Sequence, residues 1–262
     1  VASGKGGVGK STTAANLALA LAAEGASVGV LDADIYGPSM PRMFGLPSKR
    51  PHSPDGKTIE APMAHGIAVM SMGFLVDEHA PMVWRGPMVT QALNQLLGQT
   101  RWPDLDFLMV DMPPGTGDIQ LTMAQKVPVA GAVIVTTPQD IALTDARKGL
   151  EMFRKTSIAV LGIVENMSLY TCPDCGSSAS VFGKGGGARL AEDADTTLLG
   201  ELPLALEIRE GADTGNPSVA GEPEGAHAHA YRQIAIRAGV ELAQSKRDYS
   251  HRFGSVLVEE KQ

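Results

Sequence analysis

The first residues of the chain contain a glycine-rich loop that matches the phosphate-loop pattern G-x-x-x-x-G-K-[ST]. The loop reads GKGGVGKST over residues 4–12. Glycines let the backbone curl so that consecutive N–H groups point inward, and a helix that starts at Ser11 adds the positive end of its dipole. The sequence therefore predicts a nest for the phosphates of a nucleotide, built from Gly4, Lys5, Gly6, Gly7, Val8, Gly9, Lys10, Ser11 and Thr12.

Two side chains of this loop have separate expected roles. Lys10 is expected to neutralise the β- and γ-phosphates, and the Ser11 hydroxyl to bind Mg²⁺, an ion that prefers oxygen ligands. Residues 13–24 are rich in strong helix formers and contain neither Gly nor Pro, so they predict the helix that follows the loop. Since only three residues precede the loop, we expect the chain to begin within a strand and native residues to precede Val1.

Composition narrows the classes to which the chain can belong. Its formal net charge is −7, so no broad basic surface is expected for nucleic acid or anionic lipid. No apolar run is long enough to span a membrane, and residues 245–262 lack the pattern of a membrane-targeting helix. Two cysteines are too few for a disulfide framework and fit a reducing compartment. We therefore expect a cytoplasmic protein that binds neither nucleic acid nor membrane.

Apolar runs that alternate with helical segments predict the fold. We expect one α/β domain over residues 1–262, with a doubly wound, mostly parallel sheet and the nucleotide at the carboxyl ends of the strands. A loop rich in Pro and Gly is expected over residues 35–47, where it would sense the nucleotide. Strands are expected at 27–31, 67–71, 106–111, 132–136, 158–164 and 198–202, and helices at 11–24, 141–155 and 226–244, with others starting near 87 and 188.

Carboxylates at the ends of two predicted strands are expected to meet the phosphate loop. Asp32 and Asp34 follow one strand, and Asp111 closes another. An aspartate in the position of Asp111 is the Walker-B arrangement, which holds Mg²⁺ through water, and Gly115 could present its N–H to the γ-phosphate. Asp32 is expected to support the Mg²⁺ site. Either Asp32 or Asp34 could instead cap the turn that follows its strand.

A second informative stretch is Cys172-Pro-Asp-Cys175-Gly176. Two thiolates separated by two residues can grip one metal from a tight turn. A [4Fe–4S] cluster needs four cysteine ligands, so a symmetric dimer that supplies two from each subunit is the economical solution. A zinc ion held in the same way, a redox dithiol and inert cysteines are the alternatives.

The form KGGVGKST, in which Lys5 follows the first glycine, resembles the deviant phosphate-loop ATPases, such as the nitrogenase iron protein and the septum-site and plasmid-partitioning ATPases. In that group the extra lysine reaches the partner's nucleotide, and the second aspartate of a D-x-D pair orients the attacking water. The resemblance therefore implies a nucleotide-bridged homodimer with Lys5, Lys10 and Asp34 as catalytic residues. A solvated Lys5 is the alternative.

Further stretches resemble the Mrp/ApbC family of iron–sulfur cluster carrier ATPases, namely LDADIYGPS, MVWRGPM, VDMPPGTGD, VENMS, CPDCG and FGKGGGARLAE. The resemblance implies a homodimer that hydrolyses ATP slowly, binds a labile bridging [4Fe–4S] cluster through Cys172 and Cys175, and passes it from scaffold donors to apoproteins. It also implies that Asn166 reads adenine and that Pro203 lines the base pocket. Asn166 could instead form a turn, and Pro203 could simply end a strand.

A rival from another class shares the ATPase core. It is a positioning or partitioning switch of the MinD/ParA type, with a structural zinc or no metal. This rival predicts hydrolysis stimulated by lipid or DNA and no role for the cysteines. The acidic net charge counts against it.

Overall fold

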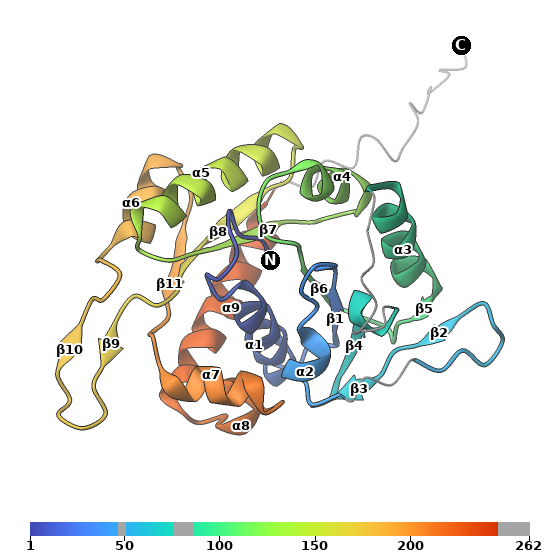
Figure 1. The fold of residues 1–262 in the computed structure, drawn as a ribbon, viewed down its shortest axis with the longest axis horizontal. Coiled ribbons are helices and arrows are strands. Elements are labelled where there is room, and N and C mark those ends of the chain that lie inside the picture. Colours follow the sequence, from blue (N-terminus) through green and yellow to red (C-terminus); the bar gives the residue numbers. More distant parts are fainter. Residues whose placement is uncertain (47–50, 76–85, 246–262) are drawn as a thin grey trace, which may run out of the picture.

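The computed structural model describes residues 1–46, 51–75 and 86–245. Most of the MVWRGPM stretch and the tail beyond residue 245 therefore lie outside the described residues. The chain folds around a central sheet with helices on both faces (Figure 1). Within the described ranges, no helix combines the length and the apolar character needed to cross a membrane.

The sheet consists of two groups of strands joined by the first residues of the chain. One group has the order β3 (Met63–Ala64), β4 (Ile67–Ser71), β1 (Val28–Asp32) and β6 (Phe107–Asp111), and the other has β7 (Ala132–Thr136), β8 (Val160–Glu165) and β11 (Leu198–Glu201). Ala2 pairs with Ile134 of β7, while Val1 exchanges backbone hydrogen bonds with Val110 and Met112. All of these pairings are parallel except that of β3 with β4. The predicted fold class is confirmed.

Helices bury both faces of this sheet. α1 (Lys10–Ala23) and α9 (Ala226–Gln244) cover one face, and α3 (Gly86–Gln99), α4 (Asp118–Lys126), α5 (Asp140–Lys155) and α6 (Gly186–Asp193) cover the other. Along β7, Ile134 joins the core under α5 while Val133 and Val135 join the core under α1. This alternation follows from the two-residue repeat of a strand. Each predicted strand is present, with its ends shifted by at most two residues.

Several short elements lie where the sequence predicts none. They are α2 (Met40–Met43), η1 (Met72–Phe74), α7 (Leu206–Asp213), α8 (Ser218–Gly221), β2 (Ile59–Glu60), β5 (Thr100–Arg101), β9 (Tyr170–Thr171) and β10 (Ser178–Ala179), together with α4. The expected loop over residues 35–47 is thus wrong in part. α2 forms because Asp32 accepts hydrogen bonds from the N–H groups of Ser39 and Met40, which fixes the first turn of the helix.

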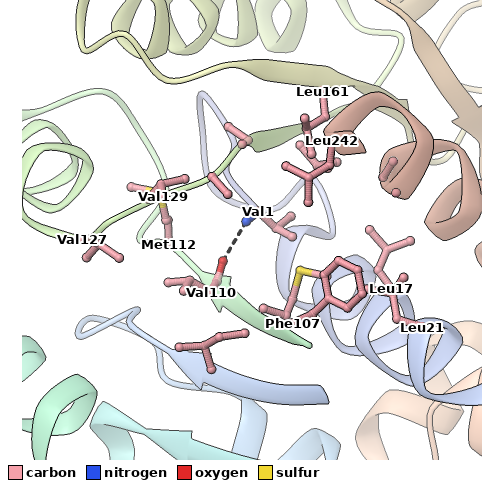
Figure 2. A pocket seen from close by; sticks show the side chains of 18 of the residues that line it. Val1, Leu17, Leu21, Phe107, Val110, Met112, Val127, Val129, Leu161 and Leu242 are labelled. Atoms are coloured by element: carbon pink, nitrogen blue, oxygen red, sulfur yellow. Dashed lines mark hydrogen bonds between the residues drawn. The ribbon is translucent and has the colours of Figure 1, made fainter. Parts of the chain in front are cut away.

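Figure 2 shows an apolar cavity of about 400 Å³ beside Val1, between β6 and β7. Its walls include Phe107 of β6, Leu17 of α1 and Leu242 of α9. The cavity runs along β6, from Phe107 at the start of the strand to Met112 just after its end.

Candidate functional site

The phosphate loop lies at the carboxyl ends of the strands, between residues 1–3 and α1. Close packing requires glycine at two of its positions. A Cβ at Gly4 would overlap the backbone of Asp145 in α5, and a Cβ at Gly9 would overlap the side-chain amide of Asn166. Gly9, with a φ of 83°, has no side chain to cap α1. The first N–H groups of that helix therefore remain available to an anion.

Lys10 lies among carboxylates that come from two neighbouring strands. Its Nζ is 2.6 Å from Asp111 Oδ1 and 3.7 Å from Asp34 Oδ2, and it donates a hydrogen bond to Ser11 Oγ at 3.2 Å. Asp32 is in register with Asp111 across β1 and β6. The structure thus brings together the loop lysine, the loop serine and the carboxylates that the sequence analysis assigns to a nucleotide–Mg²⁺ site.

Asp111 has an acceptor that the described protein atoms leave unused. The residue is fully buried, and its Oδ2 has no hydrogen-bond partner among the described residues. A buried polar atom of this kind needs a partner. A Mg²⁺-bound water would supply one, and the Ser11 hydroxyl, which also contacts Lys10, is the second oxygen that such an ion prefers. The residues present fit a Mg²⁺ ion.

Asp34 directs one carboxylate oxygen to Lys10 and the other to the turn that follows. Its Oδ1 accepts the N–H groups of Tyr36 and Gly37 at 3.2 and 3.3 Å. Burial raises the pKa of this carboxyl, and the neighbouring Lys10 opposes the shift. Asp34 is therefore held in place by its own turn, with Oδ2 on the side of the phosphate loop.

Asp32 serves the fold of the turn. Its Oδ2 accepts hydrogen bonds from Ser39 N, Met40 N and Ser71 Oγ at 2.9 to 3.0 Å, and its Oδ1 accepts from Asp34 N at 3.1 Å. Both oxygens are thus engaged, as in the turn-capping alternative. A direct contact between Asp32 and Mg²⁺ would require some of these bonds to break.

The protonation of Asp32 gives a testable pH dependence. Burial, and next the Asp111 carboxylate, raise the pKa of Asp32 to about 7. The folded protein therefore holds a proton that the unfolded chain releases from about pH 4 upward, and the free energy of unfolding should fall as the pH rises through this window. Asp32→Asn cannot titrate, so we expect it to reduce the fall between pH 5 and pH 8 by about 1 kcal/mol or more. Urea unfolding of the protein free of nucleotide and Mg²⁺ measures the free energy of unfolding at each pH. If this free energy falls as steeply with pH in Asp32→Asn as in the wild type, the prediction is wrong.

Two expected nucleotide contacts are already engaged within the protein. The N–H of Gly115 donates to Ser3 O at 2.9 Å, so it does not point to a phosphate in this structure, and that bond would have to open first. The amide of Asn166 donates to Val8 O at 2.9 Å and so braces the phosphate loop. Pro203 lies beside the same strand end, because Leu202 N donates to Glu165 O. Reading of adenine by Asn166 stays a prediction.

Cys172 and Cys175 lie at the tip of a hairpin, β9–β10, that extends away from the body of the protein (Figure 1). The tip is closed by hydrogen bonds from Cys172 N to Ser177 O and from Gly176 N to Cys172 O, both 2.9 Å. Ser177 Oγ lies 3.0 Å from Cys175 Sγ, and this hydrogen bond lowers the pKa of the exposed Cys175 thiol. In the part of the chain that the structure describes, no group of three or more His, Cys, Asp and Glu side chains could hold a metal ion. The cysteine pair thus has no third protein ligand there.

Lys5 takes no part in the ion pairs that Lys10 forms with Asp34 and Asp111. Its side chain is half-buried and forms no ion pair with the described residues. No described carboxylate of its own subunit therefore neutralises its charge through an ion pair. This position leaves it available for the contact across a dimer that the sequence resemblance implies.

Three residues that contact the site were not anticipated from the sequence. Ser71 holds Asp32, Ser177 contacts Cys175, and Glu165 is fully buried next to Asn166. Burial raises the pKa of Glu165. Glu165 could have been noticed in the sequence, because it is a carboxylate at the end of an apolar strand. The contacts of Ser71 and Ser177 are not encoded in any local sequence pattern.

Comparison with known proteins places these features in a family context. The family model of NUBPL iron-transfer P-loop NTPases, of the ParA group, matches residues 1–238. An iron–sulfur cluster carrier protein of Pseudomonas fragi is 62% identical over 240 residues, which make up 91% of this chain and 84% of that protein. One from Escherichia coli K12 is 59% identical over 242 residues, 92% of this chain and 66% of that protein. The chain thus spans just under two thirds of the Escherichia coli protein.

A solved structure supports the same comparison. The nucleotide-binding protein of Archaeoglobus fulgidus, in complex with ADP, superposes with a TM-score of 0.74 at 38% identity. The match covers 87% of this chain and 88% of that one.

Proposed function

Because the chain belongs to the NUBPL iron-transfer P-loop NTPase family, we propose that it is an ATP-hydrolysing carrier of iron–sulfur clusters. Two copies would hold a [4Fe–4S] cluster between them and pass it to apoproteins. The observation that carries this proposal is the cysteine pair, which lies at a hairpin tip with Cys175 exposed and Cys172 half-buried, and which has no third protein ligand in the described residues. Two such tips, one from each copy, supply the four thiolates that a cluster needs.

The phosphate loop would bind ATP through its backbone N–H groups and Lys10. In the structure Lys10 Nζ lies 2.6 Å from Asp111 Oδ1. The phosphates must therefore draw the lysine away from this carboxylate as ATP enters. Mg²⁺ bound with ATP would neutralise charge on the β- and γ-phosphates, with Ser11 and Asp111 as the residues that hold it, Asp111 through water.

Hydrolysis would proceed by in-line attack of a water on the γ-phosphorus, with release of ADP and phosphate. Asp34 would orient this water, since its Oδ2 faces the phosphate-loop lysine. Lys10 and the loop N–H groups would stabilise the charge that develops on the phosphoryl oxygens, and Lys5 of a second copy would add to them. The proposed homodimer thus completes both the nucleotide site and the cargo site.

Replacement of Asp34 by asparagine tests its role. Asn keeps the size of the side chain and an acceptor for the turn, but it loses the negative charge that would orient the water. We expect kcat for ATP hydrolysis to fall by about 100-fold or more, while the affinity for ATP changes little. A steady-state assay together with a fluorescent-nucleotide titration separates the two quantities. Hydrolysis at the wild-type rate would rule out this role.

Anaerobic reconstitution with iron and sulfide tests the cargo. We expect about four irons and four sulfides per dimer, with a broad absorption band of the cysteine-ligated type. Transfer is then followed by mixing the loaded protein with an apoprotein that becomes active on receiving a [4Fe–4S] cluster. Binding of zinc alone, or of no metal, would contradict the carrier and leave the cysteines with a structural role.

The positioning-switch alternative has its own signature. It requires ATP hydrolysis to rise when anionic vesicles or duplex DNA are added. We expect no such stimulation, because the protein has a net charge of −7 and such surfaces attract basic patches. A cytoplasmic location also stays a prediction, and fractionation of cells that produce the protein would test it.

A further inference from the structure

The hairpin that carries the cysteines begins after β8 and leads into α6, and Glu165 contacts both of these attachment points. We call residues 167–182 the cysteine hairpin. It leaves the sheet directly after β8, whose last residue is Glu165, and it returns through a glycine-rich loop to α6 (Figure 1). The Glu165 carboxylate accepts a hydrogen bond at its Oε2 from Gly187 N in the first turn of α6. One side chain thus ties the end of the strand to the start of the helix.

The glycines of this loop make that contact possible. A Cβ at Gly187 would lie 2.8 Å from Glu165 Cβ and 3.0 Å from Glu165 Oε2. A Cβ at Gly186 would lie 2.6 Å from Leu143 Cδ1 in α5. The start of α6 is therefore pressed against both β8 and α5, at distances that a larger residue would not permit.

Glu165 is also unusual in its burial. The residue is fully buried, and its Oε1 has no hydrogen-bond partner among the described residues. Burial of an incompletely paired carboxylate is unfavourable. Leucine or glutamine could fill similar space, so the carboxylate at this position calls for an explanation beyond packing.

The backbone around Glu165 leads in the other direction to the phosphate loop. Asn166, the next residue, donates its side-chain amide to Val8 O at 2.9 Å. Glu165 O accepts a hydrogen bond from Leu202 N at 2.8 Å, next to the predicted base-pocket residue Pro203. Glu165 is therefore adjacent to Asn166, which contacts the phosphate loop, and in contact with Gly187, where the chain enters α6 after the cysteine hairpin.

We propose that Glu165 is a positioning residue that links the phosphate loop to the cysteine hairpin, so that ATP binding changes how tightly the two cysteines bind the cluster. A nucleotide that shifts Asn166 would shift Glu165, and through Gly187 it would shift the foot of the hairpin. This inference rests on the proposed function for the identity of the cargo. The link itself depends on contacts within the chain and can be tested without iron.

Three variants separate the link from general packing. Glu165→Ala removes the acceptor for Gly187 N, whereas Glu165→Gln retains an acceptor oxygen in the same volume. Gly187→Ala keeps the carboxylate and forces the strand and the helix apart. Glu192→Ala is the matched control, because Glu192 is an exposed carboxylate near the far end of α6. Thermal unfolding establishes that each variant is folded.

The first measurement is hydrogen exchange of the metal-free protein, with and without ATP and Mg²⁺. We expect ATP to change exchange in the cysteine hairpin by roughly fivefold in the wild type, in Glu165→Gln and in Glu192→Ala, and to leave it unchanged in Glu165→Ala and Gly187→Ala. ATP hydrolysis should stay within about twofold of the wild type in every variant, because none of these side chains contacts Lys10, Asp34 or Asp111. A wild-type hairpin that does not respond to ATP would overturn the proposal, and so would a folded Glu165→Ala that responds fully.

The second measurement uses the loaded protein and a ferrous chelator as the probe of release. We expect ATP to change the rate of iron release in the wild type and in Glu165→Gln but not in Glu165→Ala. If the wild type takes up no cluster, the carrier function fails while the exchange experiment still decides the link. If the cluster is bound and Glu165→Ala retains the full ATP effect on release, the link fails and the carrier function stands.

Discussion

Lys10→Ala is expected to abolish ATP hydrolysis and to destabilise the nucleotide-free protein at the same time. Lys10 is buried, and its Nζ lies within 4 Å of two carboxylates, those of Asp111 and Asp34. Without the lysine, the phosphates lose their main cation, so we expect the hydrolysis rate to fall by about 100-fold or more. The carboxylates also lose their counter-charge, which should lower the free energy of unfolding by about 3 kcal/mol near pH 8.

The pH dependence of this loss identifies its cause. Burial raises the pKa of Asp34 and Lys10 opposes the shift, so near pH 5 this carboxyl can take up a proton when the lysine is gone. The destabilisation should therefore be smaller near pH 5 than near pH 8. Urea unfolding at the two pH values measures it, and an equal loss at both would show that packing, rather than charge, is the cause.

Lys5→Ala is the matched control for Lys10→Ala. Lys5 belongs to the same loop but forms no ion pair within the described part of the chain. If it acts on the nucleotide of a second copy, its removal should impair hydrolysis and leave the free energy of unfolding within about 0.5 kcal/mol of the wild type.

Delivery of the cluster to an apoprotein should also depend on Lys10. If Lys10→Ala delivers the cluster as well as the wild type does, ATP hydrolysis and cluster delivery are not coupled.

The double substitution Cys172→Ala/Cys175→Ala is expected to remove all cluster binding and leave the nucleotide site intact. Both cysteines lie on the hairpin tip, where Cys175 is exposed, and neither has a hydrogen bond to the phosphate-loop residues. We expect iron and sulfide after reconstitution to fall from about four per dimer to background. The melting temperature and the affinity for ATP should be unchanged, because residues 173–177 of the tip are exposed.

Ser178→Ala is the matched control for this loss. Ser178 lies on the same hairpin, but its hydroxyl contacts Thr171 rather than a sulfur. It should load as much cluster as the wild type. Iron analysis, sulfide analysis and the absorption spectrum of the three proteins decide the matter together. Cluster retained by the double variant would mean that ligands other than these cysteines hold it.

Local sequence was sufficient to predict most of the sheet and the nucleotide loop. The apolar runs from Val28 and Ala132 are strands because residues buried on both faces have to be apolar throughout. The glycine pattern of residues 4–12 encodes its own conformation, since Gly9 requires a positive φ. These are properties of neighbouring residues, so they can be read along the chain.

Short elements were harder to predict because distant contacts stabilise them. α2 has only four residues, and it depends on Asp32, seven and eight residues earlier, for the hydrogen bonds at its start. The four strands of the two small ladders are two residues each, too short for a periodic pattern to show. Helix propensity and alternation are averages over a window, and they carry little information at that length.

The sequence by itself determined the phosphate loop, the main strands of the sheet, and the pair of cysteines available for a metal cargo. Only the tertiary structure decided that Asp32 is engaged by the turn, that the Gly115 N–H is taken by Ser3, and that Glu165 meets Gly187. The reason is physical. A motif fixes which groups are present, but the partner that satisfies each buried group is set by packing between segments far apart in the chain.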